Sequence, residues 1–135
     1  EHCICCAKEA AGRGLSKKVV LACLLHDASE CYMSDVPRPL KQNMKDYKQQ
    51  ESSLLDVIYR KFLGEALTEE EEKQIKAIDD DLLWYDLEML LGEKQNREKP
   101  ELHIRLDYKV RPFDMVEREY LDFFRELSSE LESKV

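Results

Sequence analysis

The sequence is poor in the two residues that interrupt helices. Its 135 residues include four glycines and four prolines, about half of the roughly 12% that these residues make up in average proteins. Charged residues make up 37% of the chain, against about 25% on average. This composition disfavours a β-sandwich, which needs many turns, and predicts long amphipathic helices. A chain of this length can bury the core of one domain without disulfides or metal staples.

Long apolar runs and an excess of positive charge are also absent. No run approaches the roughly 20 apolar residues of a membrane span, and no signal-peptide pattern opens the sequence. Lys and Arg number 21 against 29 Asp and Glu, which gives a formal charge of −8. Proteins that bind nucleic acid or anionic membranes carry a cationic surface, so we expect neither partner. We expect a soluble, cytoplasmic protein, and its charge still permits a small phosphorylated substrate held by a metal or a local cation.

The five cysteines all lie in the first quarter of the chain, at positions 3, 5, 6, 23 and 31. An odd and clustered set is a poor disulfide framework. A zinc site made of cysteines alone is an alternative, but the sequence lacks the two C-x2-C pairs of structural zinc sites. We therefore interpret the cysteines as small apolar residues on buried helix surfaces.

Apolar periodicity and helix start and stop signals predict an all-α fold. The expected helices cover residues 1–14, 16–30, 47–62 and 68–92, with a last helix from about 113. Residues 19–25 are almost continuously apolar, which is typical of a central, buried helix.

Two segments interrupt the helical pattern. The prolines in residues 35–40 predict a loop there. Residues 102–110 alternate between apolar and polar, a period of two that is typical of a strand. Since no second strand is evident, we expect at most a short extended segment or small hairpin on the helical body. His103 is then expected to lie on the exposed, polar side of that segment.

The second helix runs into an unusual group of polar residues. Leu24 and Leu25 lead directly into His26 and Asp27, and Glu30 follows His26 by four residues. On a continuous helix, residues four apart share a face and adjacent residues lie roughly 100° apart, so an imidazole and a carboxylate can reach one ion. Buried ionisable groups are costly unless they are paired or bind a metal. The alternative is a polar helix end at the surface, where the helix dipole favours histidine.

Two further residues can join this group. His2 lies among the cysteines and apolar residues of the first helix. Asp79 follows Ile75 by four residues and precedes Leu82 by three, which puts it on the inward face of its helix. We expect residues 80 and 81 to be more exposed. An ordinary solvated run of charges is the alternative for Asp79.

Together these residues resemble the signature of HD-domain metal-dependent phosphohydrolases, and especially the 5′-deoxynucleotidase-like branch with its phage-type relatives. In that branch, His-Asp is followed by Glu three residues after the Asp and by Asp eight residues after it. His26-Asp27, Glu30 and Asp35 fill these positions, and residues 37–41 form the Pro-x-Pro-hydrophobic-Lys turn that follows.

The flanking residues also resemble the family. Glu1-His2-Cys3 is similar to the start of the helix with its first metal histidine, with Cys in place of Ser. Asp79 is followed by two leucines and by Asp86, as the family's last metal aspartate is followed by leucines and an acidic residue, usually Glu.

The resemblance implies an HD-domain helical bundle with a divalent metal at its centre. It implies the metal ligands His2, His26, Asp27 and Asp79, and the catalytic residues Glu30 and Asp35. Glu30 would orient or deprotonate a water, and Asp35 would lie near the leaving group. A surface carboxylate is the alternative for Glu30, and a turn-initiating residue for Asp35. The N and O ligands suit Mn, Co, Fe or Ni better than Mg or Zn.

The implied activity is a metal-dependent phosphohydrolase that uses metal-activated water. We expect a phosphomonoesterase acting on a small nucleotide, such as a nucleoside 5′-monophosphate. A degenerate HD domain that binds a metal or nucleotide as a regulatory or interaction module is the alternative. A phosphodiesterase or an alarmone hydrolase is a third reading within the enzymes.

The domain expected from the resemblance is a single HD-type unit over residues 1–135. Members of the branch carry an upstream helix with a phosphate-binding arginine, whereas this sequence opens at Glu1 within a helical pattern. We therefore expect that an upstream N-terminal segment is missing. The aromatic face of the last helix could supply a homodimer contact.

Overall fold

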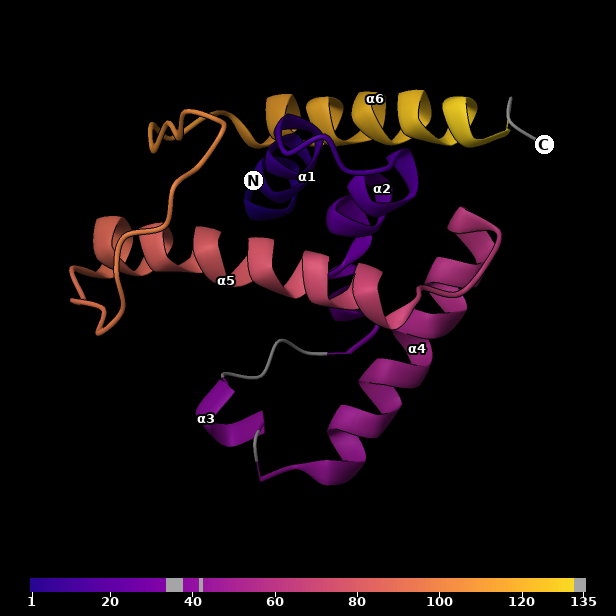
Figure 1. Cartoon of the computed structure of the whole chain (residues 1–135), viewed down its shortest axis with the longest axis horizontal. Helices are drawn as coiled ribbons and strands as arrows, with labels where there is room; N and C mark the ends of the chain where they lie inside the picture. Colours follow the sequence, from indigo (N-terminus) through magenta and orange to yellow (C-terminus); the bar gives the residue numbers. More distant parts are fainter. Residues whose placement is uncertain (34–37, 42, 133–135) are drawn as a thin grey trace.

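The computed structural model describes residues 1–33, 38–41 and 43–132, and these residues form an all-α fold (Figure 1). The long helices are α1 (His2–Gly12), α2 (Lys17–Leu25), α4 (Lys45–Leu63), α5 (Glu69–Leu91) and α6 (Phe113–Glu132). Two short elements, η1 (Ala28–Cys31) and α3 (Arg38–Lys41), lie between α2 and α4. No strand occurs among the described residues, so the expected all-α fold class is confirmed. No described helix has the length and apolar character needed to cross a membrane.

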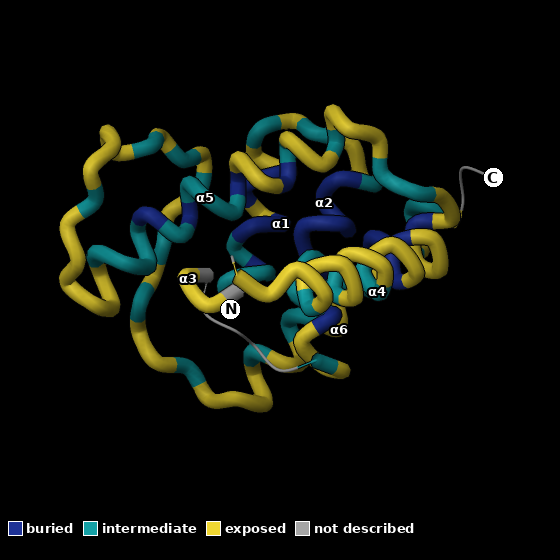
Figure 2. Tube along the Cα trace, turned by 90° about the horizontal axis from the view of Figure 1, so that it is seen from below, coloured by how far each residue is buried: buried dark blue, intermediate teal, exposed yellow. Residues whose placement is uncertain are grey.

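Helix α2 lies at the centre of the fold. Every residue from Val19 to Leu25 is buried, and the helix packs against α1, α4, α5 and α6. Figure 2 shows α1 and α2 as the most buried part of the chain, with exposed residues gathered on the surrounding helices. The prediction of a central, buried helix over residues 19–25 is therefore confirmed.

Local capping signals fix where α5 begins relative to α2. The hydroxyl of Thr68 accepts the backbone N–H of Glu71, and the carboxylate of Glu71 accepts the backbone N–H of Thr68. This reciprocal pair is a capping box, which satisfies two donors that a helix start leaves open. The ammonium of Lys18 in α2 also donates to Glu71 at 2.8 Å. The start of α5 is thereby tied to the central helix.

The segment around the two prolines differs from the prediction. We expected a loop over residues 35–40, but Arg38–Lys41 form the short helix α3. Pro39 lies in the first turn, where a backbone N–H has no partner within the helix, so its missing N–H costs nothing there. The prolines therefore do not exclude a helix after residue 37.

The connection between α5 and α6 is fastened to α1 by a buried carboxylate. Glu9 has no exposed surface, and its Oε1 accepts the backbone N–H groups of His103 at 2.6 Å and Ile104 at 3.2 Å. Arg13 Nε donates to Glu9 Oε2 at 2.6 Å. The approach is close, because a Cβ on Gly12 would lie 2.9 Å from the Cβ of His103. This anchor positions the connection over α1.

Residue 103 is exposed, as expected, but the same contact gives it a further role. His103 is half exposed, but its Nδ1 lies 3.0 Å from Glu9 Oε2. It therefore takes part in the anchor instead of pointing only into solvent. Residues 102–110 form neither a strand nor a hairpin. This agrees with the expectation that they form at most a short extended segment.

Candidate metal centre

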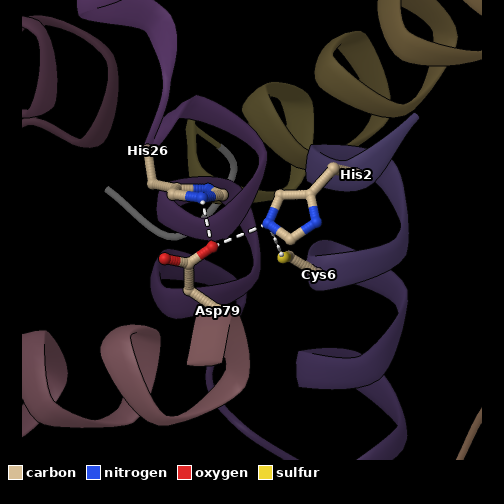
Figure 3. Close-up of side chains that lie close together, drawn as sticks. All are labelled: His2, Cys6, His26 and Asp79. Carbon is tan, nitrogen blue, oxygen red and sulfur yellow. Dashed lines mark hydrogen bonds and ion pairs between the residues drawn. The ribbon is translucent and has the colours of Figure 1, made fainter. Parts of the chain in front are cut away.

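Three helical segments bring two imidazoles and one carboxylate together beside α2. His2 comes from the first turn of α1, His26 follows the last residue of α2, and Asp79 lies within α5. Asp79 Oδ1 is 2.7 Å from His2 Nε2 and 3.2 Å from His26 Nε2, as Figure 3 shows. Three of the four residues predicted as metal ligands therefore meet at a single oxygen atom.

Asp27, the fourth predicted ligand, lies at the edge of this group. Its Oδ1 is 3.5 Å from His26 Nε2, and its side chain is 40% exposed. It does not share a set of donor atoms within 4.8 Å of one another with His2 and Asp79. Asp27 is thus adjacent to the centre through His26, but it does not meet the other ligands directly.

The expected helix face shared by His26 and Glu30 does not form. Helix α2 ends at Leu25, His26 is its C-cap, and Glu30 lies in the 3-10 turn η1. The expectation of one continuous helix is wrong because the chain leaves the α-helical path at His26. Among the described residues, two groups of potential metal donors have their donor atoms within 4.8 Å of one another: His2, Cys6, His26 and Asp79, and Cys3, His26 and Asp27. Glu30 is exposed and belongs to neither group. Asp35, the second predicted catalytic residue, lies outside the described residues.

Hydrogen bonds to the opposite ring nitrogens orient both imidazoles. His2 Nδ1 lies 2.8 Å from Asp86 Oδ2, and His26 Nδ1 lies 2.6 Å from the carbonyl oxygen of Cys23. Both partners are acceptors, so each Nδ1 carries a hydrogen and each ring turns its Nε2 toward Asp79. When the ring is neutral, Nε2 is then the atom with the lone pair that a metal ion could bind. Metal-binding histidines generally have such a partner on the other nitrogen. Tyr108 extends the arrangement by donating its hydroxyl to Asp86 Oδ1 at 2.8 Å.

The charges around the centre favour an added positive charge. Burial lowers the pKa of His2, but the hydrogen bonds to Asp79 and Asp86 outweigh it and raise this pKa to about 12. Burial also lowers the pKa of His26, but its hydrogen bond to Asp79 outweighs burial and raises this pKa well above its usual value. Burial raises the pKa of Asp79, but both imidazoles outweigh it and hold this pKa below its usual range. Two Nε2 atoms turned toward one carboxylate oxygen therefore need a cation among them, either protons or a metal ion.

The spacing of the donors fits a single divalent ion. Two ligand atoms about 2.1 Å from one ion lie about 3.0 to 3.4 Å apart at angles between octahedral and tetrahedral. Of the two pairs formed with Asp79 Oδ1, the one with His26 at 3.2 Å lies within this range, and the one with His2 at 2.7 Å lies below it. His2 and Asp79 would therefore have to move slightly apart to bind one ion.

A pocket of about 770 Å³ opens onto this centre between α4 and α5, with His26 and Asp79 in its wall. Its apolar surface comes from Leu55, Tyr59, Leu67 and Ile75. Its charged residues, apart from those of the centre, are Lys48, Lys76, Glu51, Asp56 and Glu72. Pockets of about 300 to 1,000 Å³ typically hold small molecules, so the centre is accessible to a small ligand.

Two cysteine thiols next to the centre were not recognised as candidate site residues. Cys6 Sγ is 3.5 Å from His2 Nε2, and Cys3 Sγ is 3.5 Å from Asp27 Oδ2. Cys6 is buried, as its interpretation as an apolar residue expects, but its sulfur also faces a potential ligand. The spacing of four residues between His2 and Cys6 could have indicated this, since such residues share a helix face.

Asp81 differs from its expected exposure. Its side chain is 18% exposed, less than the 26% of Asp79. The reason is a pair of guanidinium contacts, from Arg13 in α1 at 2.9 Å and from Arg97 in the connection after α5. Asp79 and Asp81, the first and last of these three acidic residues, are therefore both partly buried.

Comparison with known proteins places the chain in a family. Residues 2–111 match the HD domain. The chain is also 32% identical over 62 residues to YfdR, an uncharacterized protein of Escherichia coli (strain K12). That match covers 46% of this chain, which spans about a third (32%) of the length of YfdR. No solved structure matches the chain. Because the matched range includes every helix except α6, the chain belongs to the HD domain family.

Proposed function

We propose that this HD domain is a metal-dependent phosphohydrolase, and specifically a phosphomonoesterase acting on small nucleotides such as nucleoside 5′-monophosphates. HD domains are generally metal-dependent hydrolases, which supports the broad class. The observation that carries the proposal is the convergence of His2 Nε2 and His26 Nε2 on Asp79 Oδ1 at the wall of a pocket.

The residues that would hold the ion are His2, His26 and Asp79, with Asp27 joining from beside His26. A bound divalent ion supplies two effects, a lowered pKa of a bound water and neutralisation of charge on a phosphate oxygen. The protein keeps both imidazoles in the orientation that this requires, through Asp86 and the Cys23 carbonyl. We propose the roles of Glu30 and Asp35, at the water and at the leaving group, from the family resemblance alone.

The pocket lining supports a small substrate of modest charge. Lys48 and Lys76 can bind phosphate oxygens, while Tyr59 and its aliphatic neighbours offer an apolar surface to a nucleoside. The pocket also carries more carboxylates than ammonium groups, so a bound divalent ion brings its lining close to neutrality. A phosphate monoester with two negative charges is therefore favoured over a triphosphate or a nucleic acid strand.

A metal-binding or nucleotide-binding regulatory module is the second candidate. It is favoured by the place of Glu30 in the 3-10 turn η1, where it does not share a helix face with His26, because a general base must lie within reach of the water it activates. We also propose that residues 1–135 form a single domain, because the described helices share one core around α2. A homodimer stays a prediction.

Elemental analysis combined with a phosphate-release assay tests the function. The purified chain is expected to bind one divalent ion and to release phosphate from nucleoside 5′-monophosphates with added Mn²⁺ or Co²⁺. Asp79→Ala should lose both properties, whereas Asp122→Ala on the exposed side of α6 should retain them. Bound metal without hydrolysis would support the regulatory module, and hydrolysis unchanged in Asp79→Ala would refute the proposed centre.

A further inference from the structure

The thiol of Cys6 belongs to the same set of donor atoms as the two imidazoles and Asp79. Cys6 follows His2 by four residues in α1, so the two side chains share one face of the helix. Its Sγ lies 3.5 Å from His2 Nε2, and the donor atoms of His2, Cys6, His26 and Asp79 all lie within 4.8 Å of one another. Figure 3 shows the sulfur next to the His2 nitrogen that faces Asp79.

We propose that Cys6 binds the divalent ion of this centre as a thiolate, together with His2, His26 and Asp79, and that the centre therefore selects zinc over manganese and magnesium. The inference rests on the metal centre of the proposed function, but not on its hydrolytic activity. On binding, the S–H bond breaks, the proton passes to solvent and the sulfur donates an electron pair to the ion.

The distance between sulfur and imidazole agrees with shared coordination. Zinc lies about 2.3 Å from thiolate sulfur and about 2.0 to 2.1 Å from histidine nitrogen, so these atoms are about 3.6 Å apart in a tetrahedral site. The observed separation between Cys6 Sγ and His2 Nε2 is 3.5 Å. An ion can therefore sit between these two atoms with little change in α1.

The neighbouring cysteines do not have this geometry. Cys3 Sγ approaches His26 from the side of Nδ1, at 3.8 Å. That nitrogen donates to the carbonyl oxygen of Cys23, so it has no lone pair to share with an ion beside Cys3. Cys5, which precedes Cys6 in the helix, belongs to neither donor group among the described residues. Cys5 is thus a matched control for Cys6, and Cys3 is the competing candidate that the test must exclude.

A thiolate changes which metal the centre prefers. Thiolate is a soft ligand that favours zinc and iron, whereas magnesium and manganese prefer carboxylate, carbonyl and water. From nitrogen and oxygen ligands alone, the sequence favoured Mn, Co, Fe or Ni over Zn. With Cys6 as a ligand, zinc gains most, because its tetrahedral sites commonly combine cysteine and histidine.

Spectroscopy of the cobalt-loaded full chain tests the inference directly. A thiolate bound to Co²⁺ gives an intense charge-transfer absorption in the near ultraviolet, which imidazole and carboxylate ligands do not give. We expect this absorption in the wild type and in Cys5→Ser, and its loss in Cys6→Ser, which should still bind Co²⁺ and show its visible bands. The preference for Zn²⁺ over Mn²⁺ should fall about 10-fold or more in Cys6→Ser, at least as much as the loss of a supporting partner causes.

X-ray absorption of the zinc-loaded wild type gives a readout that needs no variant. One sulfur at about 2.3 Å from zinc is expected, and this result stands even if Cys6→Ser fails to fold. A zinc or cobalt centre without sulfur, or an absorption lost in Cys3→Ser but kept in Cys6→Ser, would overturn the role of Cys6 and leave the metal centre intact. A wild type that binds no divalent ion would overturn both proposals.

Discussion

Asp86 offers a way to weaken the metal centre without changing a proposed ligand. Its Oδ2 accepts the Nδ1 hydrogen of His2 at 2.8 Å, while its Oδ1 accepts the hydroxyl of Tyr108 at 2.8 Å. In Asp86→Asn the side chain keeps its shape but loses its charge. Its amide can also donate to His2 Nδ1, which favours the tautomer with the hydrogen on Nε2. That tautomer has no lone pair for the ion.

The size of the effect follows from the position of Asp86. Removing the partner of a metal-binding histidine typically lowers metal affinity about 10- to 100-fold, equivalent to about 1.4 to 2.8 kcal/mol. The Asp86 side chain is 27% exposed, so water can replace part of the lost interaction, and the fold should persist. We therefore expect the Kd for Zn²⁺ or Co²⁺ to rise by a factor within this range.

Competition with a chelator measures this change. Asp86→Asn is compared with the wild type, with Tyr108→Phe and with Asp122→Asn, whose side chain is 68% exposed on α6. Tyr108→Phe should raise the Kd less than Asp86→Asn, because it removes only the outer hydrogen bond, and Asp122→Asn should leave it unchanged. An Asp86→Asn protein that binds metal within about twofold of the wild type would refute the reasoning from imidazole orientation.

The helical scaffold gives predictions that are independent of metal. Glu9→Gln should lower the free energy of unfolding by about 2 to 3 kcal/mol in urea titrations, because buried hydrogen bonds to a charged group are lost. Burial raises the pKa of Glu9, but hydrogen bonds from Arg13 and His103 outweigh it and lower this pKa from 4.5. The stabilisation is therefore complete above pH 4.5 and is lost as the pH falls through the lowered value. In Glu9→Gln the free energy of unfolding should therefore fall less steeply as the pH falls. The same dependence on pH as in the wild type would contradict this role of Glu9. Thr68→Ala should cost about 1 kcal/mol through its cap, and an unchanged unfolding midpoint would show that the cap adds nothing.

The ends of several helices could be predicted from the sequence because their causes are local. The capping box at Thr68 and the left-handed glycines at positions 64 and 92 end or begin helices as expected. The burial of α2 could be predicted equally well, since a helix that is apolar on nearly all sides has no polar face to expose to solvent. Such signals depend only on residues a few positions apart.

Contacts between segments far apart in the sequence were harder to predict. Glu9 lies in the apolar face of α1. Arg13, four residues later, is one of its partners, but the backbone N–H groups that it accepts are more than 90 residues away, so the neighbouring residues do not indicate that its carboxylate is fully buried. The alternation of residues 102–110 was also ambiguous. Leu102 and Leu106 do pack against the core, but they contact helices and do not lie beside a second strand. Alternate burial of an irregular segment gives the same period of two as a strand.

The candidate site lies between these two cases. The pattern at His26-Asp27 and the inward position of Asp79 could be recognised, but the meeting of His2 and Asp79 joins residues 77 apart. Only the family resemblance connected them. The contribution of Cys6 was missed because its burial has a sufficient explanation as core packing, and the geometry of its sulfur depends on how α1 lies against α5.

The connection between α5 and α6 links the scaffold to the metal centre. Glu9 fixes this connection to α1 at His103 and Ile104, and a few residues later Tyr108 donates to Asp86, which orients the imidazole of His2. A loosened anchor would therefore reach the centre through Tyr108 and Asp86, although Glu9 touches no proposed ligand. The irregular segment thus has a physical reason to be held tightly, since the direction of one Nε2 lone pair depends on it.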